Sequence, residues 1–248
     1  MKVIKSIIKT LLNQYGYEIR RKNIKLELEG LGRDTALSFE EAKSISMLEK
    51  IQIDNSLRRV HLGCGPRILK GWINIDLVYE PFDDYLQYYT NTHYPPEIRG
   101  KQYDFYPLDI AKFGIPLPDD SVDIVFHEDF IEHLTQRSQI IVLAESLRIL
   151  KKGGVHRIST PDLLISMQES SDFSQGLKGI FLEEWDNNKH INIFTQNLLK
   201  EMALMIGYQE VIFNFRNKSI CANLLPSEYR PDQNDRSEIG NIFADLIK

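Results

Sequence analysis

The chain has 248 residues, 42% of them hydrophobic and 26% charged, which is typical of one sizeable α/β domain with additions and excludes disorder throughout. Its formal net charge of −5 argues against a nucleic-acid partner, because phosphate binding needs a concentrated basic surface. The two cysteines, Cys64 and Cys221, form no C-x-x-C pair and indicate no disulfide framework.

Residues 1–22 have the pattern of an amphipathic helix. Lysines occupy one face, and isoleucines and leucines occupy the other: Lys2, Lys5 and Lys9 against Ile4, Ile7, Ile8, Leu11 and Leu12. The lysines interrupt the apolar stretch and no small-residue cleavage site follows, so the pattern disfavours a signal peptide. We therefore expect a cytoplasmic protein whose first helix packs on the domain or on a second subunit of a homo-oligomer. Weak contact with a membrane surface is the alternative.

Residues 20–36 predict a linker, and residues 39–51 predict a helix that opens with a capping box. From residue 57 onward, strands and helices alternate, which predicts a mostly parallel sheet covered on both faces. A helix is expected over residues 136–150, with Gly153 as its C-cap. The strands expected before and after that helix cover residues 59–62, 71–76, 103–108, 121–126 and 155–159.

The C-terminal part completes the expected sheet. Thr195 is expected to cap a helix over residues 196–206. Residues 208–215 and 219–225 flank a short turn and predict an antiparallel hairpin, whereas residues 239–247 have a weak helical pattern. These patterns divide the chain into a helical extension with a linker (1–52), one α/β domain (53–225) and a C-terminal tail (226–248).

Residues 61–67 (HLGCGPR) place two glycines directly after the first expected strand, where a backbone without Cβ atoms can turn sharply and approach a ligand. The segment is not a P-loop, because no Gly-Lys-Ser/Thr follows, and Ile68 breaks the G-x-G-x-x-G dinucleotide motif. Asp76 ends the next strand, where its carboxylate can accept hydrogen bonds from both hydroxyls of a ribose. A turn former or a helix cap is the alternative role for Asp76.

Acidic residues also follow two later strands, Asp109 after the third and the pair His127-Glu128 at the fourth. Ligands of open α/β sheets bind outside the carboxyl ends of the strands. We therefore expect Asp76, Asp109 and the His127-Glu128 pair to surround one crevice.

Residues 57–163 contain several motifs in a fixed order: LGCGPR and GWINIDL, then IPLPDDSVDIVFHEDFIEHL, then ESLRILKKGGVHRISTPDL. They resemble the class I S-adenosylmethionine-dependent methyltransferases, and in particular a bacterial, type 11-like branch. The resemblance implies a methyltransferase with a Rossmann-like α/β fold, in which a mostly parallel seven-stranded sheet ends in an antiparallel hairpin. It also implies S-adenosyl-L-methionine as the cofactor, and we expect no metal ion.

The resemblance also implies cofactor contacts. The loop after the first strand would line the methionine part, Asp76 would bind the ribose, Asp109 with Ile110 would flank the adenine, and His127 with Glu128 would form the floor. The complete set is Leu62, Gly63, Cys64, Gly65, Asp76, Leu77, Asp109, Ile110, His127 and Glu128. The chain departs from the family pattern at His61, where an acidic residue is usual, and at Arg67, where a third loop glycine is usual.

Methyl transfer from a sulfonium is a displacement, and it needs a general base only when the acceptor must lose a proton. The candidates for this role are His133, Asp129, Glu132 and His190. Histidine suits the role because it titrates near neutral pH. The alternative is that Glu132 and His133 cap a helix or brace a loop.

Seven of the eleven tyrosines fall between residues 77 and 106, where their rings could stack on a sugar or could cover the edge of the sheet. Together with the resemblance, this favours O-methylation of a small molecule or saccharide-type acceptor in polysaccharide biosynthesis. A non-catalytic protein that binds S-adenosylmethionine is the alternative. A nucleic-acid base methyltransferase is disfavoured because residues 127–130 read HEDF rather than Asp/Asn-Pro-Pro-Tyr/Phe. A nicotinamide dehydrogenase is disfavoured by Ile68.

Overall fold

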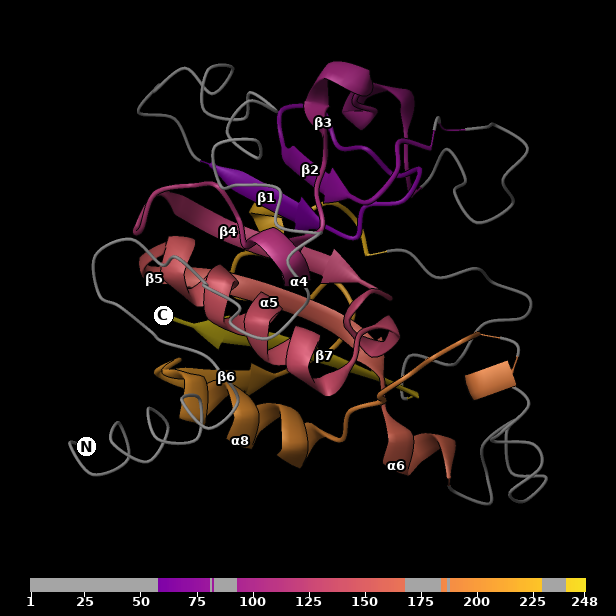
Figure 1. Ribbon diagram of the computed structural model, residues 1–248, viewed down its shortest axis with the longest axis vertical. Coiled ribbons are helices and arrows are strands. Elements are labelled where there is room, and N and C mark those ends of the chain that lie inside the picture. Colours follow the sequence, from indigo (N-terminus) through magenta and orange to yellow (C-terminus); the bar gives the residue numbers. More distant parts are fainter. Residues whose placement is uncertain (1–57, 81, 83–92, 168–183, 187, 229–239) are drawn as a thin grey trace, which may run out of the picture.

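A seven-stranded sheet forms the centre of the computed structural model, which describes residues 58–80, 82, 93–167, 184–186, 188–228 and 240–248. The strand order is β3-β2-β1-β4-β5-β7-β6, which runs from top to bottom in Figure 1. The strands are β1 (Arg59–Leu62), β2 (Ile73–Asp76), β3 (Phe105–Pro107), β4 (Val122–Glu128), β5 (Leu150–Pro161), β6 (Glu210–Phe213) and β7 (Asn241–Ile247). Strand β7 runs antiparallel to its neighbours β5 and β6, whereas the remaining pairs are parallel. The predicted mostly parallel sheet with an antiparallel end is thus confirmed.

Helices α4 (Ile110–Phe113), α5 (Gln136–Ile149) and α8 (Gln196–Ile206) lie over the face of the sheet that is turned to the viewer in Figure 1. Thr135 caps the N-terminus of α5, and its hydroxyl accepts a hydrogen bond from the Ser138 amide at 3.3 Å. Thr195 caps α8 in the same way, as the sequence predicts. The shorter helices are η1 (Pro96–Ile98), η2 (Gln102–Asp104), η3 (Ile131–His133), α6 (Leu163–Ser166) and η5 (Ala222–Leu224).

The two larger apolar clusters of the core lie on opposite faces of the sheet, because successive side chains of β4 point to opposite sides. Val125 faces the larger cluster, which the sheet forms with α5 and α8. Ile124 and Phe126 face a second cluster that includes Trp72 and Tyr94. The sequence predicted that helices cover both faces of the sheet. Among the described residues, the segment around the short helix η5 packs against the second cluster.

The end of α5 differs from the prediction. Helix α5 stops at Ile149, and β5 starts at Leu150, so Gly153 lies inside a strand and does not cap the helix. Two glycines are needed here because β5 bulges against β4. Gly153 has a φ of 77°, and a Cβ on Gly154 would lie 3.0 Å from the Asp123 carbonyl oxygen.

The expected terminal hairpin pairs different segments. Residues 219–225 contain the short helix η5, and the partner of β6 is β7 (Asn241–Ile247), which the sequence predicted as weakly helical. Six of the seven residues of β7 are buried, so the alternation that identifies a half-exposed strand is missing. The sheet therefore extends beyond residue 225, into the segment predicted as a tail.

Several predictions concern residues outside the described part of the chain. These are the amphipathic helix over residues 1–22, the linker, the helix over residues 39–51, and Tyr85, Tyr88 and Tyr89. Tyr94 is described: it is fully buried, and its hydroxyl donates to the Ile68 carbonyl, so it belongs to the core. No helix among the described residues is long and apolar enough to cross a membrane.

Candidate functional site

The loop after β1 turns on two glycines with different surroundings. Gly63 has a φ of 57°, and a Cβ built on it would lie 2.2 Å from the Phe130 ring. Gly65 has a φ of 49°, but a Cβ there would meet no atom within 4 Å. Both backbone conformations favour glycine. Gly63 therefore allows close packing inside the protein, whereas Gly65 borders open space.

Asp76, the last residue of β2, holds this loop in place. Its carboxylate accepts hydrogen bonds from the Gly65 amide at 2.8 Å and from the Leu77 amide at 2.6 Å. The neighbouring Cys64 is buried, and burial and the Asp76 charge together raise the pKa of its thiol. Each carboxylate oxygen has further lone pairs for a ligand. Asp76 thus joins the loop to the end of β2 at the edge where the sequence predicted a ribose site.

A cavity of about 630 Å³ opens at the carboxyl edge of the sheet, within the size range of small-molecule sites. Its wall contains most of the predicted cofactor-binding residues: Gly63, Cys64, Gly65, Asp76, Leu77, Asp109, Ile110 and Glu128. Asp129, Phe130 and His133 line it as well. The structure thus brings the ends of β1, β2, β3 and β4 to one crevice, as predicted.

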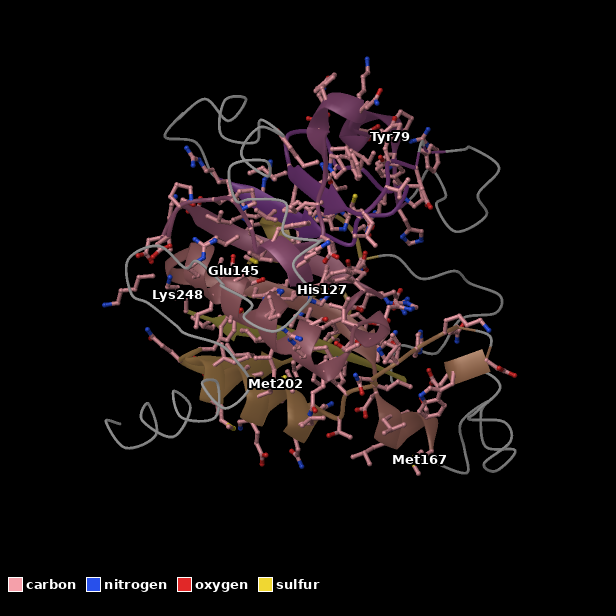
Figure 2. The ribbon with its side chains drawn as sticks, in the orientation of Figure 1. Tyr79, His127, Glu145, Met167, Met202 and Lys248 are labelled. Carbon is pink, nitrogen blue, oxygen red and sulfur yellow. The ribbon has the colours of Figure 1, made fainter. Side chains whose placement is uncertain are left out.

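Two residues predicted as cofactor contacts, Leu62 and His127, do not line this cavity. Both side chains are fully buried, and Figure 2 shows His127 in the interior of the molecule. Burial lowers the pKa of His127 to about 3, because no water solvates the charged form. Side chains alternate along a strand, so the Glu128 side chain reaches the cavity and the His127 side chain does not.

Asp109 combines both roles that were considered for acidic residues at strand ends. Its side chain accepts a hydrogen bond from the Lys112 amide at 3.1 Å and so caps α4. It also lines the cavity together with Ile110, the first residue of that helix. The cap fixes the position of Ile110 opposite Asp76.

Arg67 is a structural residue that sequence reasoning recorded only as a departure from a pattern. It is 2% exposed, and its guanidinium donates to the Glu128 carboxylate and to the carbonyl oxygens of His93 and Ser227. His61, the second departure, is buried against Phe126 and hydrogen-bonded to Asn74. Arg67 therefore ties the end of the glycine loop to the end of β4, and neither departure fills the cavity.

The four general-base candidates separate into two groups. Asp129 and His133 line the cavity, and Asp129 has a φ of 46°, in the left-handed region that Asp tolerates better than most residues. Glu132 is fully buried and accepts a hydrogen bond from the Thr160 hydroxyl at 3.0 Å. His190 is 8% exposed and bonded to Glu184. Only the first two face the cavity directly.

The His133 imidazole is neutral at physiological pH. Partial desolvation of its ring lowers its pKa, and the nearby His190 lowers it further, while the Lys189 backbone and Asp129 act in the opposite direction. A neutral imidazole has a free lone pair at neutral pH. His133 can therefore accept a proton or bind a metal ion.

Comparison with solved structures gives distant similarity over most of the chain. A methyltransferase from Thermotoga maritima, described as a possible histamine N-methyltransferase, is 14% identical with a TM-score of 0.47, covering 99% of this chain and 96% of that one. A SAM-dependent methyltransferase from Archaeoglobus fulgidus is 15% identical with the same TM-score of 0.47, covering 85% and 95% of the two chains.

Sequence comparison is more specific. A probable S-adenosylmethionine-dependent methyltransferase of Mycolicibacterium smegmatis is 46% identical over 48 residues, which are 19% of this chain and 18% of that relative. The family model described as a methyltransferase domain matches residues 61–158, from the end of β1 into β5.

Residues 61–158 are therefore similar to methyltransferase domains that use S-adenosylmethionine. The cofactor of this family is S-adenosylmethionine. The methyltransferase domain includes every predicted site residue except His190.

The described residues fit this cofactor. The open space beside Gly65 is a cradle that a Cβ would narrow, and the Asp76 carboxylate lies beside it. Ile75, Leu108 and Ile110 supply apolar wall for a flat ring, and the cavity is large enough for a nucleoside with an amino-acid tail.

Proposed function

We propose that this protein transfers a methyl group from S-adenosylmethionine to a hydroxyl group of a small-molecule or saccharide-type acceptor. The observation that carries the proposal is a single cavity with two chemically different walls. One wall is the glycine loop braced by Asp76, and the other contains Asp129 and His133.

The first wall suits the cofactor, whose sulfonium supplies an activated methyl group when it is bound. Asp76 would accept hydrogen bonds from the ribose hydroxyls, and Ile110 would contact the adenine. The backbone at Gly63 and Gly65 would lie against the amino-acid end, since a Cβ at Gly65 would project into this space. These residues act by positioning the donor, which lowers the barrier by fixing the reacting geometry.

The second wall suits an acceptor that must lose a proton. A hydroxyl is a poor nucleophile until a base removes its proton, and a base helps only within hydrogen-bonding reach. Asp129 and His133 are the candidates that line the cavity, and the lowered pKa of His133 leaves it neutral and basic at pH 7. We assign the proton-accepting role to one of these two residues.

A second, open hollow supports a saccharide-type acceptor. It is lined by Leu77, which also lines the first cavity, and by Val78, Tyr79, Gln102, Tyr103, Phe105 and Pro107. Tyr103 is 64% exposed, and Tyr79 packs edge-on against Phe105. Figure 2 shows Tyr79 beside the β3 edge of the sheet. The exposed Tyr103 and the half-buried Tyr79, next to the Gln102 amide, can provide stacking and hydrogen bonding together, as sugar binding requires.

A labelled-methyl assay tests the proposal. The full chain is incubated with methyl-labelled S-adenosylmethionine and with fractions of small molecules and saccharides, beside Asp76→Ala and the control Asp119→Ala. Asp119 is an exposed residue paired with Arg148, and it does not line the cavity. We expect transfer by wild type and control, and at least about tenfold less by Asp76→Ala, because lost hydrogen bonds to a charged group cost about 1.5–3 kcal/mol.

Transfer that is unaffected by Asp76→Ala would contradict the cofactor assignment. Tight binding of S-adenosylhomocysteine without transfer to any fraction would favour the alternative of a non-catalytic binding protein.

A further inference from the structure

Glu132, His133 and His190 form a compact cluster at the wall of the cavity. One potential ligand atom from each residue lies within 4.8 Å of the other two. The rings of His133 and His190 are 4.9 Å apart at an angle of 77°. Glu132 and His133 belong to η3, whereas His190 approaches from the segment before α8. Ile191 donates from its backbone amide to the Glu132 carbonyl at 2.8 Å, which fixes the two segments together.

His190 is held as metal-binding histidines usually are. Its Nδ1 contacts the Glu184 carboxylate at 2.7 Å, and the Ser166 hydroxyl donates to the other oxygen of Glu184 at 2.8 Å. Both Glu184 and His190 are buried. A metal-binding histidine almost always donates its second ring N–H to such a partner, which sets the tautomer and the ring orientation. The contact leaves Nε2 of His190 as the nitrogen with a lone pair for a metal ion.

The other two members of the cluster are also oriented by neighbours. The Thr160 hydroxyl donates to one oxygen of Glu132 at 3.0 Å. The His133 side chain interacts with the Lys189 backbone. Each of the three groups is therefore positioned by a polar group behind it.

We propose that Glu132, His133 and His190 bind one divalent transition-metal ion such as Zn²⁺. Two imidazoles and one carboxylate with an open fourth position are a common ligand set of catalytic zinc sites. Ligand bonds of about 2.0–2.1 Å place tetrahedral ligand atoms about 3.4 Å apart. The ligand atoms now lie within 4.8 Å of one another, so metal binding would require them to move closer, and the exposed His133 side chain is the one that lines the cavity.

An ion bound by this cluster would be close to the cavity, because its ligand His133 lines the cavity together with Asp129. An acceptor hydroxyl that coordinates a divalent ion loses its proton more readily. With the lone pair of His133 bound to the metal, Asp129 is the candidate base that remains. This use of the metal rests on the proposed function, whereas the metal site itself does not.

A measurement of the metal content of the protein tests the proposal without relying on enzymatic activity. The full chain, freed of purification tags and treated with a chelator, is mixed with ZnCl₂ and desalted, and zinc is measured by mass spectrometry. The variants are His133→Ala and His190→Ala, with His93→Ala as the matched control because His93 lies outside the cluster. His133→Ala alters an exposed side chain and leaves the buried contacts intact. Circular dichroism and S-adenosylhomocysteine titration accompany every variant.

We expect about one zinc per chain in wild type and in His93→Ala, and loss of zinc in His133→Ala and His190→Ala. Glu184→Gln should weaken zinc binding by about 10- to 100-fold, the usual effect of removing a group behind a ligand. A wild-type protein that retains no zinc, or folded His133→Ala and His190→Ala proteins that retain as much as wild type, would overturn the proposal. Failure of S-adenosylhomocysteine binding with normal zinc content would instead contradict the proposed function.

Discussion

Gly63 and Gly65 show how two identical residues in one loop serve different purposes. Both have positive φ values, so any other residue would strain the backbone at either position. Only Gly63 has a neighbour in the way, the Phe130 ring, whereas the space next to Gly65 is open to the cavity. The first glycine therefore matters most for folding, and the second for ligand binding.

We predict that Gly63→Ala and Gly65→Ala separate stability from binding. Both variants should lose about 1–2 kcal/mol of unfolding free energy from the left-handed backbone, and Gly63→Ala should lose more because Phe130 must move. Gly65→Ala should weaken S-adenosylhomocysteine binding by more than its stability loss explains. Urea unfolding and calorimetric titration of both proteins check this prediction, and equal unfolding free energies would contradict it.

His127 is a buried polar residue without a hydrogen-bond partner for either ring nitrogen among the described residues. Its ring packs against Phe130 and His156. The pKa of about 3 in the folded protein lies below the ordinary value of 6.5. Below pH 6.5 the unfolded chain therefore binds a proton that the folded chain does not, so stability that is present above pH 6.5 is lost as the pH falls towards 3.

We predict that His127→Leu stabilises the protein and reduces its sensitivity to acid. Replacing an unpaired buried polar group by an apolar one of similar size should raise the unfolding free energy by about 1 kcal/mol at pH 7. Well below pH 6.5, the variant should also avoid a loss of about 1 kcal/mol per pH unit. Urea unfolding at pH 7, 6 and 5 measures both effects. Parallel stability curves for the two proteins would refute the buried, neutral state of His127.

Among single residues, the sequence predicted that Asp76 and the glycine loop lie at the carboxyl edge of the sheet, because both occur at the ends of recognisable strands. It did not reveal the role of Arg67, whose partners Glu128 and Ser227 lie 61 and 160 positions away. It also did not reveal the hydrogen bond between Ile191 and Glu132, since only folding brings the segment before α8 to η3.

Among the elements, β7 shows most clearly which structure the local sequence pattern predicts and which structure depends on the tertiary fold. The strands β1 to β4 were predicted because each is a short apolar run followed by a turn or loop. The cap of α8 was predicted because Thr195 precedes apolar periodicity, whereas the cap of α5 by Thr135 was not predicted. Strand β7 was missed because burial on both faces removes the alternating pattern, and its pairing with β5 and β6 is set by the tertiary fold.

We predict that deletion of residues 241–248 abolishes cooperative folding. Strand β7 lies between β5 and β6, so its removal leaves the hydrogen-bonding edges of both strands unpaired and exposes Ile242, Phe243 and Leu246. Thermal unfolding followed by circular dichroism should show no sharp transition. A truncated chain that still unfolds cooperatively and binds S-adenosylhomocysteine would show that these residues are the tail the sequence predicted.

Across the whole molecule, a buried ionic network connects β5 and β7 to the segment that follows β6. Arg157, with no exposed side chain, forms two hydrogen bonds with Glu228 at 2.5 and 2.9 Å. It also contacts Asp245 of β7 at 3.3 Å, and Asp245 accepts from Asn214 and Ser219. Removing one partner leaves a buried charge uncompensated, which costs far more than the loss of an exposed pair.

We predict that Glu228→Ala lowers the unfolding free energy by about 3–5 kcal/mol. The matched control Asp119→Ala removes the exposed partner of Arg148 and should cost less than about 1 kcal/mol. Urea unfolding at pH 7 provides both values. Similar small losses in the two variants would mean that the network is hydrated and contributes little.

The central claim is that the glycine loop and the Asp76 carboxylate together bind the adenosyl cofactor at the carboxyl edge of the sheet. Calorimetric titration with S-adenosylhomocysteine tests it most directly, with wild type, Asp76→Ala and Asp119→Ala measured under one buffer condition. The account predicts one site per chain, unchanged affinity in Asp119→Ala, and a Kd about 10- to 100-fold higher in Asp76→Ala. Equal affinity of wild type and a folded Asp76→Ala protein would contradict it.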